Sequence, residues 1–289
     1  MIRPEEPVGL LAGAGRFPLA FARKARETGL RVVAIAIQDH ADAQLARYCW
    51  QYHEVGPFQM GRMIRLLKRA GVRQVVMAGK LHKADLMYRP WRWLHWLPDW
   101  RTLSWYYFRH RRDNRDDTVL LSVIEEWQRD GLSFASALEI CPELLVKPGV
   151  LTRRVPTAAE QADIDFGWKL AKAMGGLDVG QSVMIKDKVA LAVEAIEGTD
   201  RAITRAGELC RKGGFTVVKV AKPSQDMRFD VPTVGTHTIE TLAKAGGKVL
   251  AIEAEKTILL DQAETIALAD KLGLSIVCLA REAQPLTTK

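Results

Sequence analysis

The sequence contains little cysteine, and its histidines form no recognisable zinc motif. Only 4 of the 289 residues are cysteines, none of them in a C-x-x-C pair, and the 6 histidines show no H-E-x-x-H spacing. This excludes a disulfide-rich secreted scaffold and disfavours a zinc site. We therefore expect reduced, mostly buried thiols in a cytosolic protein.

Long apolar runs are also missing. No stretch of about 18 uncharged apolar residues is present to span a bilayer, and Arg16 interrupts the apolar run near the start, so a signal peptide is not expected. With 48% hydrophobic and 26% charged residues, the chain has the composition of a globular protein. Its 42 basic residues outnumber 34 acidic ones, for a net charge of +8, which favours an anionic partner such as nucleic acid, phosphate or a membrane surface.

Short apolar runs that alternate with helical periodicity predict an α/β fold. In the first half we expect three strands and two intervening helices, and therefore a parallel sheet covered by helices. The strands are expected at 8–12, 32–37 and 74–77, with helices at about 16–27 and 60–70; a further helix is expected at 118–129.

The second half shows the same alternation. A helix is expected to begin after Thr157, a plausible N-cap, with an apolar stripe that includes Phe166 and Met174. Strands are expected at 182–185, 189–195, 217–220, 249–252 and 275–278, with helices from 199, at 237–245 and at 263–272. We predict a two-domain α/β protein, with a Rossmann-like N-terminal substrate-binding domain in 1–148 and a C-terminal α/β catalytic domain in 149–289.

Two glycine loops follow predicted strands of the first half. Gly13-Ala14-Gly15 opens a helix, and its backbone N–H groups could cradle a phosphate. A plain tight turn is the alternative. A dinucleotide site is weaker, because Pro18 stands where the fingerprint has its third glycine, although Asp39 lies near the place of a ribose-binding acid.

The second loop, Gly79-Lys80-Leu81-His82, lies beyond the carboxyl end of its strand, where open α/β sheets bind ligands. Lys80 and His82 could contact anionic oxygens there, or the loop could simply be basic and solvated.

The segment 88–112 combines nine aromatic residues and six arginines with one acid, Asp99. Tryptophan and arginine suit lipid headgroups, so contact with a membrane interface or with acyl chains is the first interpretation. Packing in the core and stacking on nucleic-acid bases are the alternatives.

Charged residues gather at two places in the second half. Glu194, Glu197 and Asp200 surround Thr199 where a strand ends and a helix begins; Thr199 or Asp200 could simply cap the helix, but such a site can also hold a phosphate with its metal ion. The loop from Lys219 to Gly235 joins cations that could hold a diphosphate to two aspartates that could bind Mg²⁺ or orient water. A structural salt-bridge loop is the alternative.

Several ordered motifs together resemble one family. Asp178-Val179-Gly180-Gln181, the run from Ala192 to Asp200 and the loop from Lys222 to Gly235, with the two glycine loops and Asp116-Asp117 in the same order, resemble the LpxI family of UDP-2,3-diacylglucosamine pyrophosphatases. The resemblance spans roughly residues 8–280.

The resemblance implies Mg²⁺-dependent hydrolysis of UDP-2,3-diacylglucosamine to UMP and 2,3-diacylglucosamine 1-phosphate in lipid A biosynthesis, with water attacking the β-phosphorus and the lipid ligand between two domains. Asp230 matches the essential aspartate, as metal ligand or water-orienting base. The metal ligands implied are Glu197, Asp200, Asp226 and Asp230. The substrate-binding residues implied are Gly13, Gly15, Gly79, Lys80, Leu81, His82, Gln181, Thr199, Lys222 and Arg228.

The implied partner is a lipid-linked UDP-sugar rather than nucleic acid. We expect a cytoplasmic protein that is peripheral on the inner face of the cytoplasmic membrane, and a homodimer is compatible with the family. The competing functions are an NAD(P)-dependent oxidoreductase, based on the first glycine loop, and a non-enzymatic nucleic-acid-binding module, based on the aromatic segment.

Overall fold

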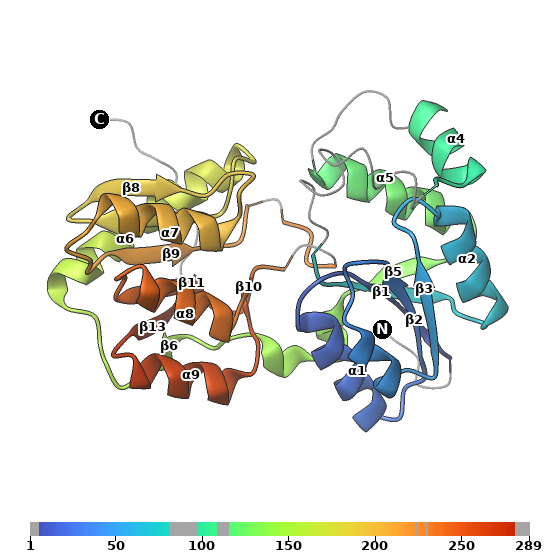
Figure 1. The fold of residues 1–289 in the computed structure, drawn as a ribbon, viewed down its shortest axis with the longest axis horizontal. Helices are drawn as coiled ribbons and strands as arrows, with labels where there is room; N and C mark the ends of the chain where they lie inside the picture. The colour runs from blue at the N-terminus through green and yellow to red at the C-terminus, as the bar shows by residue number, and fades with distance from the viewer. Residues whose placement is uncertain (1–5, 81–96, 109–115, 224, 229–230, 281–289) are drawn as a thin grey trace. The chain divides into compact units, whose positions relative to one another are not determined.

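The computed structural model describes residues 6–80, 97–108, 116–223, 225–228 and 231–280, and it consists of two compact units, residues 1–142 and 143–289 (Figure 1). Each unit is built around its own β-sheet, so the predicted α/β class is confirmed. The domain boundary placed after residue 148 stays a prediction.

The N-terminal unit contains a five-stranded parallel sheet in the order β3-β2-β1-β4-β5. Its central strands are almost entirely apolar and buried, as expected for a parallel sheet covered on both faces. The strands are β1 (Val8–Ala12), β2 (Val32–Ile37), β3 (Gln51–Val55), β4 (Gln74–Ala78) and β5 (Ser133–Ala135). The Rossmann-like parallel sheet predicted for the first half is therefore present.

Helices α1 (Phe17–Glu27) and α2 (Met60–Arg69) connect strands of this sheet. The α1 crossover leads from β1 to β2 and the α2 crossover leads back from β3 to β4, so right-handed connections place the two helices on opposite faces. The unit also contains the helices α4 (Trp100–Phe108) and α5 (Asp116–Gln128), with short 3₁₀ turns at Ala43–Tyr48 and Ala137–Glu139. A further 3₁₀ turn, Pro142–Leu144, spans the point in the chain where the two units are divided.

The C-terminal unit contains a six-stranded mixed sheet in the order β6-β13-β11-β9-β7-β8. Strands β9, β11 and β13 run parallel, whereas β7, β8 and β6 each pair antiparallel with a neighbour. Its strands are β6 (Gly149–Val150), β7 (Ser182–Lys186), β8 (Val189–Val193), β9 (Thr216–Lys219), β11 (Val249–Glu253) and β13 (Ser275–Leu279). A separate pair of short strands, β10 (Thr233–Val234) and β12 (Ile258–Leu259), lies outside this sheet.

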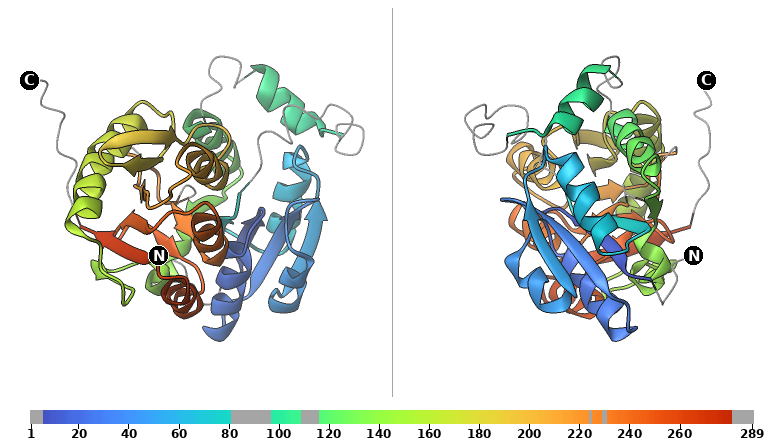
Figure 2. Two further views of the ribbon diagram at one scale, coloured as in Figure 1. Left: turned by 60° about the vertical axis from the view of Figure 1, so that its left-hand side comes forward. Right: turned by 90° about the vertical axis from the view of Figure 1, so that its right-hand side faces the viewer.

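Helix α6 (Ala158–Gly176) covers one face of this sheet, and helices α7 (Thr199–Leu209), α8 (Thr236–Lys244) and α9 (Gln262–Lys271) cover the other (Figure 2). Alternate strand residues divide between the two cores, as the two-residue period of a strand requires. Val218 packs with α6, whereas Val217 packs with α7 and α8.

Thr157 caps α6 as predicted. Its hydroxyl accepts a hydrogen bond from the Glu160 backbone N–H, and the Glu160 carboxylate accepts one from the Thr157 backbone N–H. The buried face of α6 carries Ile164 and Trp168, whereas Phe166, from the predicted apolar stripe, is 40% exposed. The predicted stripe therefore coincides with the packed face only in part, because Met174 is buried and packs in the same core whereas Phe166 does not.

No helix in the described part of the chain is both long and apolar enough to cross a membrane. Of the four cysteines, Cys141 and Cys278 are buried and Cys49 and Cys210 are half-buried. Burial raises the pKa of the Cys278 thiol to about 12, as expected for a structural rather than a reactive cysteine.

Candidate functional site

The N-terminal unit presents a polar edge where the strand order reverses. Strands β1 and β4 are neighbours, but the chain continues outward from them in opposite directions, and open α/β sheets bind ligands beyond the carboxyl ends of such strands. Gly13 to Gly15 follow β1, and Gly79 and Lys80 follow β4. The fold therefore brings the two predicted glycine loops together.

The two loops are joined through their backbones. The Ala14 N–H donates to the Lys80 carbonyl at 2.8 Å, and the Lys80 N–H donates to the Ala14 carbonyl at 2.9 Å. A Cβ atom on Gly13 would lie 2.7 Å from the Lys80 carbonyl oxygen, and one on Gly79 would lie 2.7 Å from the Ala14 carbonyl oxygen. Gly79 also has a φ of +89°. Only glycine permits this approach.

The remaining groups at this glycine edge suit an anion. Gly15 has a φ of +101° with open space around its α-carbon, and α1 begins two residues later without a side-chain cap. The N–H groups of a first helical turn lack intrahelical partners and attract anions. Lys80 is exposed beside them. Leu81 and His82, also predicted here, lie outside the described residues.

The C-terminal unit presents a different polar edge, built from side chains. The end of β8, the start of β7 and the ends of β9 and β11 lie next to one another. Each carries a polar residue there that is at most 8% exposed, although most of the sheet interior is apolar. These residues are Glu194, Ser182, Lys219 and Glu253.

On the α7 side of this edge, a hydrogen-bonded chain links Lys219 to Glu194 through Thr199. The Lys219 Nζ donates to the Thr199 Oγ1 at 2.8 Å, and the Thr199 hydroxyl donates to the Glu194 Oε1 at 2.8 Å. The Ser182 hydroxyl lies 3.5 Å from the Thr199 Oγ1. Buried charges need such partners. Thr199, a predicted substrate-binding residue, thus lies at the centre of a buried polar cluster at the start of α7.

On the α6 side, Lys172 and Glu253 form a buried ion pair with a 2.6 Å separation. Both residues also bond the backbone of Ala221, just beyond β9. Burial lowers the pKa of Lys172, although its hydrogen bond to Glu253 opposes that shift. The Lys172 ammonium also lies 5.5 Å from the centre of the Trp168 ring, where a cation–π attraction contributes.

The loop after β9 begins at Ala221 and carries several predicted site residues. The Lys222 ammonium bonds the Asp178 carboxylate at 2.6 Å, and the Lys222 N–H donates to the Gln225 Oε1 at 2.7 Å. Asp178 belongs to the motif that supported the family resemblance. The predicted cation Lys222 is therefore held by two groups of its own unit.

Asp226 and Arg228 are paired within the same loop. The Arg228 guanidinium bonds both carboxylate oxygens, the shortest contact being 2.5 Å, and the Arg228 N–H donates to the Asp226 Oδ1. These bonds lower the pKa of Asp226 and raise that of Arg228. Asp230, the predicted catalytic residue, lies outside the described residues.

The other predicted metal ligands lie apart from this pair. Glu197 bonds Arg205 at 2.6 Å, and Asp200 lies 3.5 Å from His237. The described residues contain no group of three or more His, Cys, Asp or Glu side chains that could hold a metal. One observation fits a hard cation: within the described structure, the Asp200 Oδ1 is buried without a hydrogen-bond partner, and carboxylate oxygen is the donor Mg²⁺ prefers. The metal site stays a prediction.

Gln181 lies beside this edge, and its backbone carbonyl accepts a hydrogen bond from the Val220 N–H at 3.0 Å. Its Oε1 is buried with no hydrogen-bond partner among the described residues, which leaves an acceptor for a ligand hydroxyl or amide. This suits the predicted substrate-binding role of Gln181.

Lys172 and Glu253 were missed by the sequence reasoning, and neither belongs to a motif. Two features of the sequence could have indicated them. Lys172 falls one helical turn after Trp168 on the buried face of α6, and Glu253 ends an otherwise apolar strand. A lone charge at an apolar position needs a partner, but the identity of that partner required the fold.

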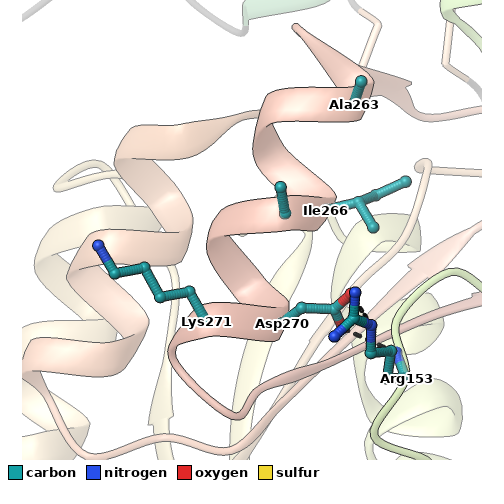
Figure 3. Close-up of a pocket in the computed structure, with 6 residues that line it drawn as sticks. Arg153, Ala263, Ile266, Asp270 and Lys271 are labelled. Atoms are coloured by element: carbon teal, nitrogen blue, oxygen red, sulfur yellow. Dashed lines mark hydrogen bonds and ion pairs between the residues drawn. The ribbon is translucent and has the colours of Figure 1, made fainter.

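A shallow hollow lies elsewhere in the C-terminal unit, beside the amino end of β13 (Figure 3). The Arg153 N–H donates to the Asp270 carboxylate at 2.7 Å, and the Arg153 guanidinium lies 3.6 Å from it. Because these polar groups already pair with each other, the hollow offers a ligand little. It is lined by Arg153, Ala263, Ile266, Ala267, Asp270 and Lys271.

Among solved structures, the chain is similar to the biotin carboxylase subunit of pyruvate carboxylase, at 14% identity and a TM-score of 0.27, over 72% of this chain and 33% of that chain. It is also similar to the biotin carboxylase domain of the Hydrogenobacter thermophilus 2-oxoglutarate carboxylase, at 13% identity and a TM-score of 0.27, over 72% of this chain and 42% of that chain. Similarities this weak support no conclusion about fold or function.

The sequence comparisons cover both units. The LpxI N-terminal domain family matches residues 7–144, and the LpxI C-terminal domain family matches residues 147–277. The UDP-2,3-diacylglucosamine pyrophosphatase LpxI of Caulobacter vibrioides is 30% identical over 287 residues, which is 96% of this chain and 99% of that protein. The resemblance identified from the motifs is confirmed, and the chain belongs to the LpxI family.

Proposed function

We propose that this protein hydrolyses the diphosphate bond of UDP-2,3-diacylglucosamine, releasing UMP and 2,3-diacylglucosamine 1-phosphate in lipid A biosynthesis. The observation that carries the proposal is the match to an LpxI pyrophosphatase over nearly the whole of both chains. The two polar edges support it, because a nucleotide diphosphate needs both anion-binding groups and ionisable side chains.

The chemical step is assigned to the C-terminal edge. Lys222 and Arg228 begin in ion pairs with Asp178 and Asp226, and both cations can also bond diphosphate oxygens, because ammonium and guanidinium groups form charge-assisted hydrogen bonds with phosphate as well as with carboxylate. Thr199 is the first residue of α7, so its backbone N–H has no partner within the helix and can bond a phosphate oxygen. These residues stabilise the negative charge that builds up as the bond breaks.

We propose that Asp230 orients the attacking water and accepts its proton. A water–phosphorus bond forms at the β-phosphorus, the bridging P–O bond breaks, and its electron pair leaves with UMP. Asp200, Glu197, Asp226 and Asp230 are the oxygen ligands proposed for Mg²⁺. When bound, Mg²⁺ neutralises charge on the phosphate oxygens.

The glycine edge of the N-terminal unit is assigned a binding role. The Gly15 N–H, the N–H groups at the start of α1 and the Lys80 ammonium suit phosphate oxygens, whereas Leu81 and His82 are proposed as neighbouring substrate contacts. This edge binds without supplying an acid or base.

The reaction is tested by incubating the full-length protein with UDP-2,3-diacylglucosamine in water enriched in oxygen-18. We expect UMP release with Mg²⁺, little or none after chelation, and the heavy oxygen in 2,3-diacylglucosamine 1-phosphate. Label in UMP would move the attack to the α-phosphorus. No release by folded protein would contradict the proposed function.

We further propose that the protein contacts an anionic membrane surface through α4. Asp99 caps this helix, because its carboxylate accepts a hydrogen bond from the Thr102 N–H at 2.9 Å. The same carboxylate connects the helix to α2, because it also accepts a hydrogen bond from the Arg62 N–H at 3.0 Å. Trp105 is buried, whereas Trp100 and Phe108 are 81% and 82% exposed. The helix is therefore held firmly while large apolar side chains face outward.

Basic residues of α2 lie beside α4. Arg65, Lys68 and Arg69 line a shallow hollow together with Arg101 of α4 and one acid, Asp130, which pairs with Lys68 and Arg101. The cations outnumber this acid, and α2 itself contains no acidic residue. Such a surface suits a membrane interface. There, aromatic rings insert among the lipid headgroups and neighbouring guanidinium groups bind the lipid phosphates. Nucleic acid would also attract these cations, but binding to it would not require Trp100 and Phe108 to enter an apolar phase.

Vesicle flotation tests this contact. Wild type should float with vesicles that contain phosphatidylglycerol and not with pure phosphatidylcholine. The double variant Trp100→Ser/Phe108→Ser should lose most of this binding, whereas Leu209→Ser, which removes a leucine 64% exposed in the C-terminal unit, should keep it. Equal binding by all three proteins would contradict the assignment of α4.

A further inference from the structure

The buried pair of Lys172 and Glu253 is connected to the backbone of one residue in particular. The Lys172 Nζ donates to the Ala221 carbonyl at 2.9 Å, and the Ala221 N–H donates to the Glu253 Oε2 at 2.8 Å. The Lys172 Nζ also bonds that same Glu253 oxygen at 2.6 Å. The pair therefore holds both the donor and the acceptor of the Ala221 residue.

All three residues are almost fully buried. Lys172 is 7% exposed, Glu253 2% and Ala221 1%. Burying two charges costs much of what their attraction returns, so pairs of this kind contribute little net stability and can be replaced by apolar residues without loss. Stability alone is therefore a weak reason for placing this pair at the sheet edge.

Ala221 directly precedes the loop that carries the proposed diphosphate cations. Lys222 follows Ala221, and a Cβ atom on Gly175 of α6 would lie 3.3 Å from the Lys222 Cα. Lys222 also exchanges hydrogen bonds with Gln225, at 2.7 and 3.1 Å. The direction of the chain at Ala221 therefore determines where Lys222 and the following residues lie.

We infer that Lys172 and Glu253 are positioning residues, which fix the backbone on both sides of the Ala221 α-carbon and thereby aim the loop from Lys222 to Arg228 at the substrate. This inference rests on the proposed diphosphatase function for its kinetic test, but not for its structural test. The nearby Lys256 is a natural control: its ammonium lies 3.1 Å from the other Glu253 oxygen, it is exposed, and no bond from its side chain to Ala221 is found in the described structure.

The kinetic test uses the double variant Lys172→Met/Glu253→Met, which removes both charges and retains apolar volume. We expect it to fold, with kcat for UMP release about 10- to 100-fold lower, because small misplacements of positioning groups have effects of this size. KM should change by less than about twofold. Lys169→Met on the exposed face of the same helix and Lys256→Met should both leave kcat unchanged.

A double variant with the melting temperature and kcat of wild type would overturn the inference, because the pair would then not be needed to hold the Ala221 backbone in place. If the double variant does not fold, Glu253→Gln serves instead, since it keeps the shape and one acceptor; it should lower kcat more than Lys256→Met does, and equal kcat values would overturn the inference.

Amide hydrogen exchange supplies the test that needs no activity. In the wild type, the Ala221 N–H should exchange as slowly as the amides of β9 and β11, and in Glu253→Gln it should exchange at least about tenfold faster while those strands stay protected. Rapid exchange of Ala221 in the wild type would overturn the inference. Absence of UMP release with a protected Ala221 would overturn only the proposed function.

Discussion

The two units carry polar groups at equivalent edges of their sheets, but one edge consists of backbone groups and the other of side chains. Both edges lie beyond the carboxyl ends of parallel strands. The glycine edge of the N-terminal unit is made of backbone, with Gly13 and Gly79 in close contact with the opposing loop. The edge of the C-terminal unit is made of buried side chains, with Lys172 and Lys219 each bonded to buried partners.

Under the proposed function, this difference separates binding from chemistry. Backbone N–H groups bind anions without titrating, so the glycine edge is suited to holding phosphate at any ordinary pH. Buried lysines and carboxylates are suited to aligning charge around a reacting group, because their positions are fixed by mutual hydrogen bonds. A common sheet architecture thus supports two different tasks.

The largest effect on stability is expected for a substitution at Gly79, in the glycine edge. Gly79→Ala forces a residue into a φ of +89° and places its Cβ 2.7 Å from the Ala14 carbonyl oxygen. We expect a loss of about 2 to 4 kcal/mol in the free energy of unfolding, or a displaced loop and a raised KM, measured by urea denaturation and substrate titration.

Gly29→Ala is the matched control, because Gly29 has a φ of +79° and a Cβ added there would have no atom within 4 Å. It should cost about 1 kcal/mol and leave KM unchanged. Equal effects of the two substitutions would show that close backbone approach does not define the glycine edge.

At the C-terminal edge, Thr199→Val removes the hydroxyl that joins Lys219 to Glu194. We expect a destabilisation of about 1 to 3 kcal/mol, because buried polar groups lose a partner, together with a lower kcat. Urea denaturation and UMP release measure the two effects.

Thr199→Ser keeps the hydroxyl and should retain most of the stability and activity. If the serine and valine variants were equally impaired, the methyl group rather than the hydrogen-bonded chain would account for the role of Thr199.

The smallest effect on stability is expected at the pair of Asp226 and Arg228. The Arg228 guanidinium lowers the pKa of Asp226, so the pair stabilises the fold above the unfolded aspartate pKa of about 3.9 and loses that contribution as the pH falls through the lowered value. Asp226→Asn should cost up to about 1 kcal/mol at pH 6.

Urea denaturation at pH 6 and at pH 3 measures this difference. The gap between wild type and Asp226→Asn should narrow at the lower pH. A gap that stays constant would show that the pair does not contribute through its charge.

Much of the fold was predictable because its strands are apolar and its helices periodic. Strands β1, β2 and β4 and helices α1 and α2 were expected close to their observed bounds. Strand β3 was missed because its sequence, QYHEV, is largely polar and only partly buried at the edge of the sheet. Local composition does not reveal pairing that a neighbouring strand provides.

The site was predictable where residues follow neighbouring strands. Gly13 and Gly79 meet because parallel strands end at the same edge. The pair of Lys172 and Glu253 joins a helix to a strand 81 residues away, and no local pattern indicates this contact. The roles of the predicted carboxylates, Asp230 above all, stay predictions for experiment.

The central claim, that the C-terminal unit performs Mg²⁺-dependent diphosphate hydrolysis, is tested most directly by UMP release from UDP-2,3-diacylglucosamine. Wild type, Asp230→Ala and the control Asp165→Ala, which removes an exposed carboxylate of α6, would be compared with Mg²⁺ and after chelation. The account predicts metal-dependent release by wild type and Asp165→Ala, and a loss of at least about 100-fold in a folded Asp230→Ala. Undiminished release by Asp230→Ala, or none by the folded wild type, would contradict it.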